Sequence, residues 1–413
     1  MSKQNIQTLK GFRDFLPKEK MARDFVVQKI KEVFEKFGFQ PLETPTLEYA
    51  SLLLGKYGDE ADKLVYTFTD RGERQIGLRY DQTVPSARVL TQYQDKLPKY
   101  FRRYQIQNVF RADKPQKGRF REFTQCDIDI FGSTSPLADA EIMACTYEAL
   151  KNIGFKNVIL KFNDRETLIN TLEKFATKEV SVFSLIQSID KLDKIEPEDV
   201  VAELVRKGLD QTQAELALTS INSAEKSVNL SEIEQIVSTL GVPQESLQFA
   251  PTLARGLDYY TGMIFEIIIP EYGVGSCGGG GRYDRLIQDL GGPNTPAVGV
   301  AFGFDRVVEA ATTLELLPNN QGVEVLVANF DQKAQKATLN AVKILREIGI
   351  KTELYPALEK VGKQLKYADQ NGYQYILLIG EEETKNQTVT IKNMKTGNQK
   401  NININEIANL RQV

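Results

Sequence analysis

The N-terminal part of the chain carries an amphipathic pattern with the spacing of an α-helix. Apolar side chains recur every three or four residues at Met21, Phe25, Val26, Ile30, Val33, Phe34 and Phe37. Residues at that spacing share one face of a helix, so the pattern predicts a helix over 21–37 that packs against a core. Gly38 is placed to end it. Residues 40–47 then indicate a strand interrupted by Pro41 and Pro45.

Residues 100–131 have the pattern of a long antiparallel hairpin. Two sets of residues alternate along the second arm: Arg121, Phe123, Gln125, Asp127 and Asp129 on one face, and Glu122, Thr124, Cys126, Ile128 and Ile130 on the other. Because a strand points successive side chains to opposite faces, one face becomes apolar and the other carries an amide and two carboxylates. A solvated face normally mixes Lys, Thr and Glu. The row therefore suits an inward-facing polar pocket, with a sheet that has one wet face as the alternative.

The middle of the chain is predicted to be mainly helical. Ser135 can cap a helix whose first turn holds Pro136, and Gly154 is placed to end that helix. A strand is expected at 158–162. Apolar residues then return at helical spacing over about 164–240, which indicates a helical insertion.

Strand character returns at 259–269, and a polar linker at 318–322 separates a distinct C-terminal unit. The pattern of this unit predicts a strand at 323–328, a helix at 333–348, a strand at 351–354, a helix at 360–370, a strand at 375–379 and a hairpin around 396–398. Alternation of strands and helices is typical of an α/β domain.

Length and composition favour a globular protein. The chain has 413 residues, 41% hydrophobic and 26% charged, which suggests roughly two to four domains. No apolar run approaches the roughly 18 residues that span a bilayer. The first residues, Met1–Gln4, have no apolar signal core, so a cytoplasmic protein is expected. With a net charge of −3, contacts with nucleic acid must come from local basic patches.

The absence of histidine restricts the possible chemistry. The chain has no histidine, which excludes Ser-His-Asp and Cys-His nucleophile systems and histidine-ligated metals. Its three cysteines, Cys126, Cys145 and Cys277, form no CxxC pair, so neither a disulfide framework nor a metal site is expected. Any chemistry must use carboxylates, arginines, lysines, backbone groups or the substrates themselves.

The loop at 111–121 is basic and joins the two arms of the hairpin. Arg111 stands at the end of the first arm, and arginine suits bidentate contact with carboxylate or phosphate. Lys114, Lys117 and Arg119 could contact a nucleic-acid backbone. A solvated turn is the alternative interpretation.

Three further segments combine glycine with charged or aromatic residues. Residues 275–284 hold four consecutive glycines, which make sense where the backbone approaches a ligand or another strand closely, a flexible loop being the alternative. Residues 255–262 place Arg and Asp beside two tyrosines that either pack in the core or line a polar pocket. Residues 296–306 predict a strand, a glycine turn and a helix, and Arg306 in that helix has no packing explanation.

Together these segments resemble the ordered motifs of class II aminoacyl-tRNA synthetases, and of the histidine-specific branch in particular. Residues 38–47 (GFQPLETPTL) are similar to motif 1, which builds the dimer interface in that family, 111–129 to motif 2 and 296–306 to motif 3. Residues 255–260 (RGLDYY) and 280–284 (GGRYD) resemble the two histidine-specific motifs. The resemblance covers essentially the whole chain. It implies an α/β (α+β) fold with an antiparallel-sheet catalytic core.

The resemblance also implies how the chain divides. A catalytic core is expected from residues 1–163 and 241–315, interrupted by a helical insertion domain at 164–240. A linker at 316–322 would lead to an α/β anticodon-binding domain at 323–413.

The same resemblance implies a site for L-histidine. Asp81 and Thr83 would hold the amino group, Asp129 would accept a hydrogen bond from an imidazole nitrogen, and Tyr260 would meet the ring from the other side. Asp81 and Asp129 stand where many bacterial members carry Glu. The implied histidine-binding set is Asp81, Thr83, Arg111, Gln125, Asp129, Arg255, Tyr259 and Tyr260.

ATP and tRNA contacts are implied in the same way. Arg111 would hold the α-phosphate and the substrate carboxylate, Arg306 the γ-phosphate, and Arg255 the charge that develops at the α-phosphate, so that Arg255 and Arg111 are the expected catalytic residues. The implied ATP-binding set is Arg111, Asp113, Arg121 and Arg306. The implied contacts with the tRNA acceptor end are Gln116, Lys117 and Arg119.

The implied activity is that of a histidine–tRNA ligase, working as a homodimer on L-histidine, ATP and tRNA(His), with Mg²⁺ accompanying ATP. This chemistry needs positioning and electrostatic stabilisation but no side-chain nucleophile, so a chain without histidine can perform it. One alternative is a non-catalytic, synthetase-like regulatory subunit of histidine biosynthesis, which typically lacks the C-terminal domain. A purely sensory module and a synthetase for another amino acid are further alternatives.

Overall fold

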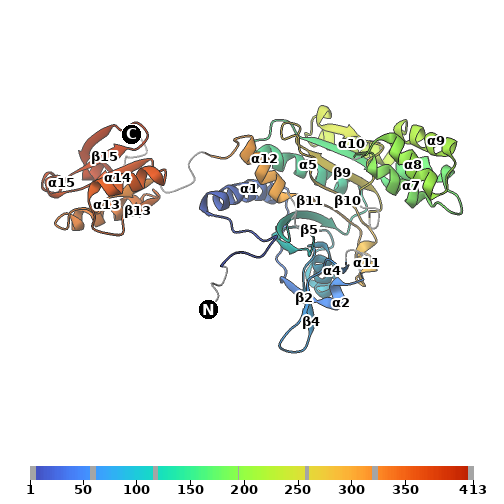
Figure 1. The fold of residues 1–413 in the computed structure, drawn as a ribbon, viewed down its shortest axis with the longest axis horizontal. Coiled ribbons are helices and arrows are strands. Elements are labelled where there is room, and N and C mark those ends of the chain that lie inside the picture. The colour runs from blue at the N-terminus through green and yellow to red at the C-terminus, as the bar shows by residue number, and fades with distance from the viewer. Residues whose placement is uncertain are drawn as a thin grey trace. The chain divides into compact units, whose positions relative to one another are not determined.

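The structure, a computed structural model, describes residues 6–55, 62–114, 120–193, 195–255, 260–318 and 324–407. The chain divides into two compact units, Met1–Leu317 and Pro318–Val413. Each unit has its own sheet and its own hydrophobic core (Figure 1).

A large sheet of order β1-β5-β6-β11-β10-β9-β7-β8 forms the centre of the first unit. Neighbouring strands are antiparallel except at the two edges, where β1 pairs with β5 and β7 with β8 in parallel. The predicted hairpin is confirmed as β5 and β6, whose arms pair from end to end. The strands are Gln40–Pro41 (β1), Phe101–Phe110 (β5), Glu122–Phe131 (β6), Ile159–Asp164 (β7), Leu247–Phe249 (β8), Met263–Ile268 (β9), Ser276–Arg282 (β10) and Ala297–Phe302 (β11).

Helices cover one face of this sheet and form the main core with it (Figure 1). They are α1 (Pro17–Lys36), α5 (Pro136–Ile153), α10 (Val228–Thr239) and α12 (Phe304–Thr313). The predicted caps of α5 are confirmed: the Ser135 hydroxyl accepts a hydrogen bond from the amide of Leu137 at 3.3 Å, and Gly154 ends the helix at φ 119°. Helix α1 begins earlier than expected because Pro17 suits its first turn.

The helical character predicted after residue 164 is confirmed. Helices α6 to α9 enclose a core of their own that includes Leu168, Leu204 and Ile221. Ile264 of β9 joins this core, so these helices cover one end of the sheet. Their bounds are Arg165–Leu172 (α6), Val182–Ile189 (α7), Pro197–Lys207 (α8) and Gln211–Asn222 (α9), with 3₁₀ turns at Glu173–Phe175 and Asp190–Asp193.

The sequence pattern did not predict the small elements between β1 and β5. Strands β2 (Leu47–Tyr49), β4 (Gln75–Leu78) and β3 (Thr67–Thr69) form an antiparallel sheet in that order. Helix α4 (Thr83–Gln92) follows and, with α11 (Leu286–Asp289), packs against the large sheet. The remaining short elements are α2 (Ala50–Leu53) and 3₁₀ turns at Gln94–Lys96 and Gln244–Ser246.

The second unit is a mixed sheet of order β13-β12-β14-β15-β16 with helices packed on it. The predicted order of strands and helices is confirmed, and α15 is an addition that the pattern missed. The bounds are Val325–Val327 (β12), Gln335–Glu347 (α13), Thr352–Leu354 (β13), Val361–Gln370 (α14), Tyr375–Leu378 (β14), Glu381–Asn386 (α15), Thr388–Asn393 (β15) and Gln399–Asn403 (β16). Across the described ranges of both units, no helix has the length and apolar character to cross a membrane.

Candidate active site

A polar row lies on the face of the large sheet opposite the main core. In the β5–β6 hairpin, Gln107 pairs with Gln125, and Gln105 with Asp127. The carboxylates of Asp127 and Asp129 are on residues only 4% and 5% exposed. Ile128, which alternates with them, belongs to the main core on the other face. The predicted inward-facing row is therefore confirmed, and the wet-face alternative is wrong.

Asp129 is held from two sides by buried partners. Its Oδ1 accepts a hydrogen bond from the hydroxyl of Tyr283, and its Oδ2 lies 2.7 Å from Nη2 of Arg103, which is directly opposite on β5. Burial raises the pKa of Asp129, while the charge of Arg103 and the hydrogen bond from Tyr283 oppose that rise. Burial also raises the pKa of Tyr283 well above its usual value, and the Asp129 charge adds to the effect.

Arg103 is a site residue that the sequence interpretation missed. It is 1% exposed, and it lies within the charged row on β5. The signal was present, because Arg103, Gln105 and Gln107 alternate with Tyr104 and Ile106 in the first arm of the hairpin, as the row does in the second. Only the register across the hairpin shows that this arginine faces Asp129.

Asp127 shares the same buried surroundings. Burial raises its pKa well above the usual value, the nearby carboxylates of Asp129 and Asp81 add to that rise, and Arg103 and Arg111 oppose it. Its Oδ1 atom has no hydrogen-bond partner among the described residues, and neither has Oε1 of Gln125. Buried polar atoms are normally paired, so atoms of this kind are places where a bound molecule or water completes the site.

Glycines form the part of the sheet beside this row. Asp129 of β6 pairs with Gly299 of β11, which pairs with Gly281 of β10. In the same way, Asp127 pairs with Ala301, which pairs with Gly279. A Cβ atom on Gly299 would overlap the Asp129 carboxylate. The run of glycines thus lies in strand β10 and is not a flexible loop. The neighbouring strands and side chains approach these glycines so closely that a side chain would not fit.

Arg255 stands on the far side of this glycine surface. Its Nε forms an ion pair with Glu266 of β9. Gly279 pairs with Glu266 in the sheet, and a Cβ on Gly279 would overlap the Arg255 guanidinium. Arg255 therefore lies over Gly279, with the acidic row on the other side of the glycines. Residues 256–259, including the predicted Tyr259, lie outside the described ranges.

Arg111 lies where β5 ends, as the sequence predicted. Its Nε donates to the carbonyl of Tyr80 at 3.2 Å, and its guanidinium carbon lies 4.3 Å from the centroid of the Tyr80 ring and 5.2 Å from that of Phe123. These contacts hold the planar cation between aromatic faces. Its charge reaches Asp127, whose pKa it lowers.

The segment before α4 brings Asp81 to the same place. Its Oδ1 accepts from the amide of Val84 at 3.1 Å, which ties Asp81 to the first turn of α4. The charge of Asp81 raises the pKa values of both Asp127 and Asp129. Tyr260 packs with the apolar cluster under α4 and α11.

The predicted nucleotide residues lie in two places. Arg121 donates to the carbonyls of Asp113 at 3.0 Å and Lys10 at 3.3 Å, which fixes the base of the motif 2 loop. Arg306 is exposed in the first turn of α12 and donates to the carbonyl of Ser276 at 2.7 Å. The predicted tRNA contacts Gln116, Lys117 and Arg119 are outside the described residues.

Two charged residues of the GGRYD segment have structural partners. Arg282 forms a buried ion pair with Asp139 of α5 and donates to the carbonyl of Ser133 at 2.8 Å. It also pairs with Asp284 at 3.0 Å. These contacts fix the end of β10, so that the neighbouring Tyr283 reaches Asp129.

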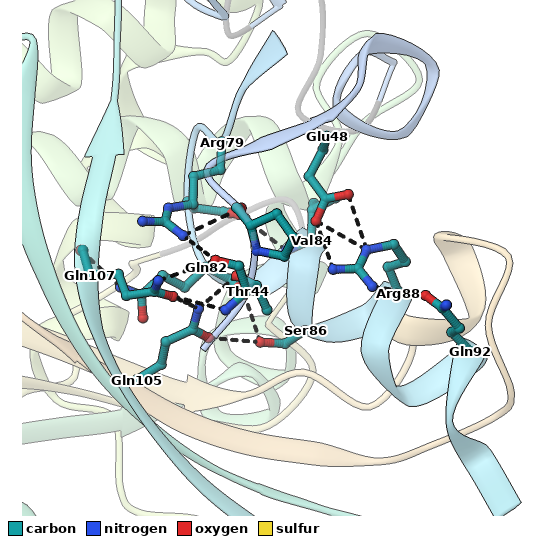
Figure 2. Close-up of polar contacts among 12 residues, drawn as sticks. Thr44, Glu48, Arg79, Gln82, Val84, Ser86, Arg88, Gln92, Gln105 and Gln107 are labelled. Carbon is teal, nitrogen blue, oxygen red and sulfur yellow. Dashed lines mark hydrogen bonds and ion pairs between the residues drawn. The ribbon is translucent and has the colours of Figure 1, made fainter. Parts of the chain in front are cut away.

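A network of amide side chains supports the row from the β5 side (Figure 2). Gln82 Nε2 donates to the carbonyls of Gln107 and Gln125 at 3.0 and 3.1 Å, which ties the start of α4 to both arms of the hairpin. Gln105 Nε2 donates to the hydroxyl of Thr44 at 2.8 Å. Buried Arg79 donates to the carbonyls of Thr44 and Asn108, as Figure 2 shows for Thr44.

Among the described residues, no metal cluster is found at this site, and a surface hollow of the first unit lies elsewhere. In the described parts of the chain, no three His, Cys, Asp or Glu side chains are grouped so as to hold a metal ion. A hollow of about 450 Å³ lies beside α1 and the β1–β5 edge and is lined in part by Lys31, Glu43 and Tyr104. No predicted site residue lines this hollow, so it is not the candidate active site.

A largely antiparallel sheet backed by helices, with arginines and carboxylates around a glycine surface on its other face, defines the chain as a class II aminoacyl-tRNA synthetase. A family model described as histidyl-tRNA synthetase matches residues 11–307, and one described as an anticodon binding domain matches 323–411. The chain belongs to the histidyl-tRNA synthetase family.

Individual relatives agree with this assignment. A histidine–tRNA ligase of Christiangramia forsetii is 38% identical, with 97% of each chain covered. The crystal structure of histidyl-tRNA synthetase from Nostoc sp. is 28% identical, with a TM-score of 0.87 and full coverage of both chains. A Bacillus halodurans structure titled as an ATP phosphoribosyltransferase regulatory subunit/histidyl-tRNA synthetase has a TM-score of 0.75 at 22% identity, which shows the fold alone.

Proposed function

We propose that the chain is a histidine–tRNA ligase that converts L-histidine and ATP to histidyl-adenylate and pyrophosphate and then transfers the histidyl group to the 3′ end of tRNA(His). The observation that carries the proposal is the Asp129 carboxylate, buried and fixed by Arg103 and Tyr283 beside a glycine surface. An imidazole N–H requires an acceptor held in such a place.

The histidine roles are proposed residue by residue. Asp129 and Gln125 bind the side chain, and Tyr260 meets the ring from the other side. Asp81 and Thr83 hold the amino group, which is supported by the shared electrostatic surroundings of Asp81, Asp127 and Asp129. Tyr259 remains a predicted member of the set.

The nucleotide roles follow the positions of the arginines. Arg111 holds the α-phosphate together with the substrate carboxylate, and Arg255, across the glycine surface, stabilises the charge that develops at the α-phosphorus. Arg306 holds the γ-phosphate, and Asp113 and Arg121 contact the nucleotide. The histidine carboxylate then attacks the α-phosphorus in line and pyrophosphate leaves. Positioning and electrostatic stabilisation supply the catalysis, because no protein nucleophile is needed.

Magnesium is proposed to accompany ATP. Mg²⁺ usually binds through one or two protein carboxylates together with the phosphates of its nucleotide. Glu266 of β9, which pairs with Arg255, would be a carboxylate able to hold the ion beside the proposed α-phosphate position. When bound, the ion neutralises phosphate charge. Arg255 and Arg111 orient the phosphate and the attacking carboxylate.

The remaining assignments extend beyond the reacting groups. The proposed division is a catalytic core at 1–163 and 241–315, an insertion domain at 164–240 and an anticodon-binding domain at 323–413, with Gln116, Lys117 and Arg119 contacting the tRNA acceptor end. A cytoplasmic homodimer is proposed, and the 43% and 58% exposure of Leu47 and Tyr49 on β2 supports an interface next to motif 1.

Histidine-dependent ATP–pyrophosphate exchange tests the proposed function. The purified chain should exchange label with L-histidine and not with the other amino acids, and sedimentation should give the mass of a dimer. A regulatory subunit would bind histidine without exchange. Exchange with another amino acid alone would contradict the proposed substrate.

A further inference from the structure

We propose that Arg103 is a positioning residue for substrate specificity, which holds Asp129 as an oriented anion so that Asp129 accepts the ring N–H of histidine. The inference rests on the proposed function. It adds Arg103, which does not contact the substrate itself but controls the charge and orientation of Asp129, which does.

The geometry of Arg103 fits this role. Its side chain is fully enclosed, with 1% of the residue exposed, and it lies directly opposite Asp129 in the hairpin. Nη2 of Arg103 is 2.7 Å from Oδ2 of Asp129, while the hydroxyl of Tyr283 donates to Oδ1. The Tyr283 hydrogen bond holds Oδ1, and Arg103 forms an ion pair with Oδ2, which has no hydrogen-bond partner among the described residues.

The surrounding amides keep Arg103 in place. Its Nη1 lies 3.3 Å from Oε1 of Gln105 and 3.4 Å from Oε1 of Gln82. Gln105 is itself fixed by Thr44 at 2.8 Å, and Gln82 by the carbonyls of both hairpin arms, as in Figure 2. A guanidinium with several fixed acceptors is preorganised, which a lysine ammonium at the same position would not be.

Electrostatics explain why the row needs a cation. Asp129 faces Arg103 of β5, Asp127 beside it on β6, Tyr283 after β10 and Asp81 before α4. Burial and the charge of Asp81 favour a neutral acid at Asp129, whereas Arg103 and the hydrogen bond from Tyr283 favour the anion. A neutral acid presents a donor, whereas an anion presents acceptors on both oxygens. Without Arg103 the charged acceptor for the imidazole N–H would be lost, and only the weaker acceptor of a neutral acid would remain, even with Asp129 in place.

The test uses Arg103→Gln and Arg103→Lys in the full-length protein, with steady-state exchange kinetics. Loss of a charge-assisted hydrogen bond to histidine should raise its KM by about 30-fold in Arg103→Gln and by less in Arg103→Lys, which keeps the charge, while the KM for ATP changes by less than about threefold. 2-Thiazolylalanine, whose ring has no N–H, serves as a competitive inhibitor of the exchange. Its inhibition constant should change by less than about threefold in the same variants.

Arg79→Gln is the matched control. Arg79 is also buried, at 3% exposure, and is part of the same network, but its donors meet backbone carbonyls of Thr44 and Asn108. Its loss should lower the melting temperature. It should change the KM values for histidine and ATP by the same small factor.

A double-variant cycle covers the case in which Arg103→Gln folds poorly. In an Asp129→Asn background, the additional Arg103→Gln change should alter the histidine KM by less than about threefold, because the anion that Arg103 positions is already absent. Equal effects on histidine, 2-thiazolylalanine and ATP, or an Arg103→Gln effect that is undiminished in the Asp129→Asn background, would overturn the inference. A wild-type protein that shows no histidine-dependent exchange would overturn the proposed function instead.

Discussion

The two faces of strand β6 differ in what their side chains do. Ile128 points into the main core under the helices, whereas Asp127 and Asp129, its immediate neighbours, point to the opposite face. Both faces are buried to a similar degree. Apolar burial stabilises the fold, but buried carboxylates oppose it unless they are paired. The apolar face is thus explained by stability, and the polar face by the proposed binding of histidine.

The largest effect is expected where charge develops during the reaction. Arg255→Ala should lower the turnover number for exchange about 100- to 1000-fold, because a preorganised cation next to the α-phosphorus would be lost. Its thermal midpoint should stay near that of the wild type, since Arg255 is only partly buried. Undiminished exchange would remove Arg255 from the proposed mechanism.

On the apolar face, the effect should fall on stability. Ile128→Ala removes a fully buried side chain and should lower the free energy of unfolding of the first unit by about 3 kcal/mol. Denaturant unfolding followed by circular dichroism measures this. At denaturant concentrations below those that unfold the protein, the KM for histidine should change by less than about twofold. A selective loss of histidine affinity would contradict the assignment of the apolar face to stability alone.

The adjacent residue on the polar face should behave in the opposite way. Asp127→Asn should raise the stability by about 1 kcal/mol at pH 8, where Ile128→Ala lowers it. Burial raises the pKa of Asp127, so its ionised form costs stability above the ordinary carboxyl pKa. The stabilising effect of Asn should therefore shrink as the pH falls toward 4.5. Thermal melts from pH 4.5 to 8 measure this, and a destabilised Asn variant at pH 8 would contradict the cost ascribed to the buried Asp127 charge.

The smallest effect concerns a carboxylate far from the polar row. Hydrogen bonds, first from Lys191 and then from Ser188 and Lys207, lower the pKa of Glu203 to about 2. A carboxyl with a lowered pKa contributes stability above its unfolded pKa, and that stability is lost as the pH falls toward 2. Glu203→Gln should thus cost about 1 kcal/mol at pH 7 and nothing near pH 2, with exchange activity unaffected. Melts across that range give the comparison.

Local chemistry made much of the fold predictable. Helix α5 was predicted from Ser135 and Gly154, because caps are local signals. The hairpin and its polar row were predicted from alternation alone. Helix α15 was missed because its residues, Glu381–Asn386, are polar and have no apolar period.

The parts of the site that were missed depend on contacts across strands. The role of Arg103 depends on its pairing with Asp129, and that of Gly299 on the space that the same carboxylate takes. The pattern of residues along the sequence does not show which residues pair across neighbouring strands. Asp81 and Arg111 were named through resemblance to known motifs, and their partners Val84 and Tyr80 became visible only in the structure.

Binding of L-histidine by wild type and Asp129→Asn, measured by isothermal titration calorimetry with ATP as the paired ligand, tests the central claim most directly. The Asn variant should bind histidine at least about 30-fold more weakly than the wild type, and ATP within about twofold of it. Equal histidine affinity in the two proteins, or an equal loss for both ligands, would contradict the claim that the polar face of the sheet recognises the imidazole.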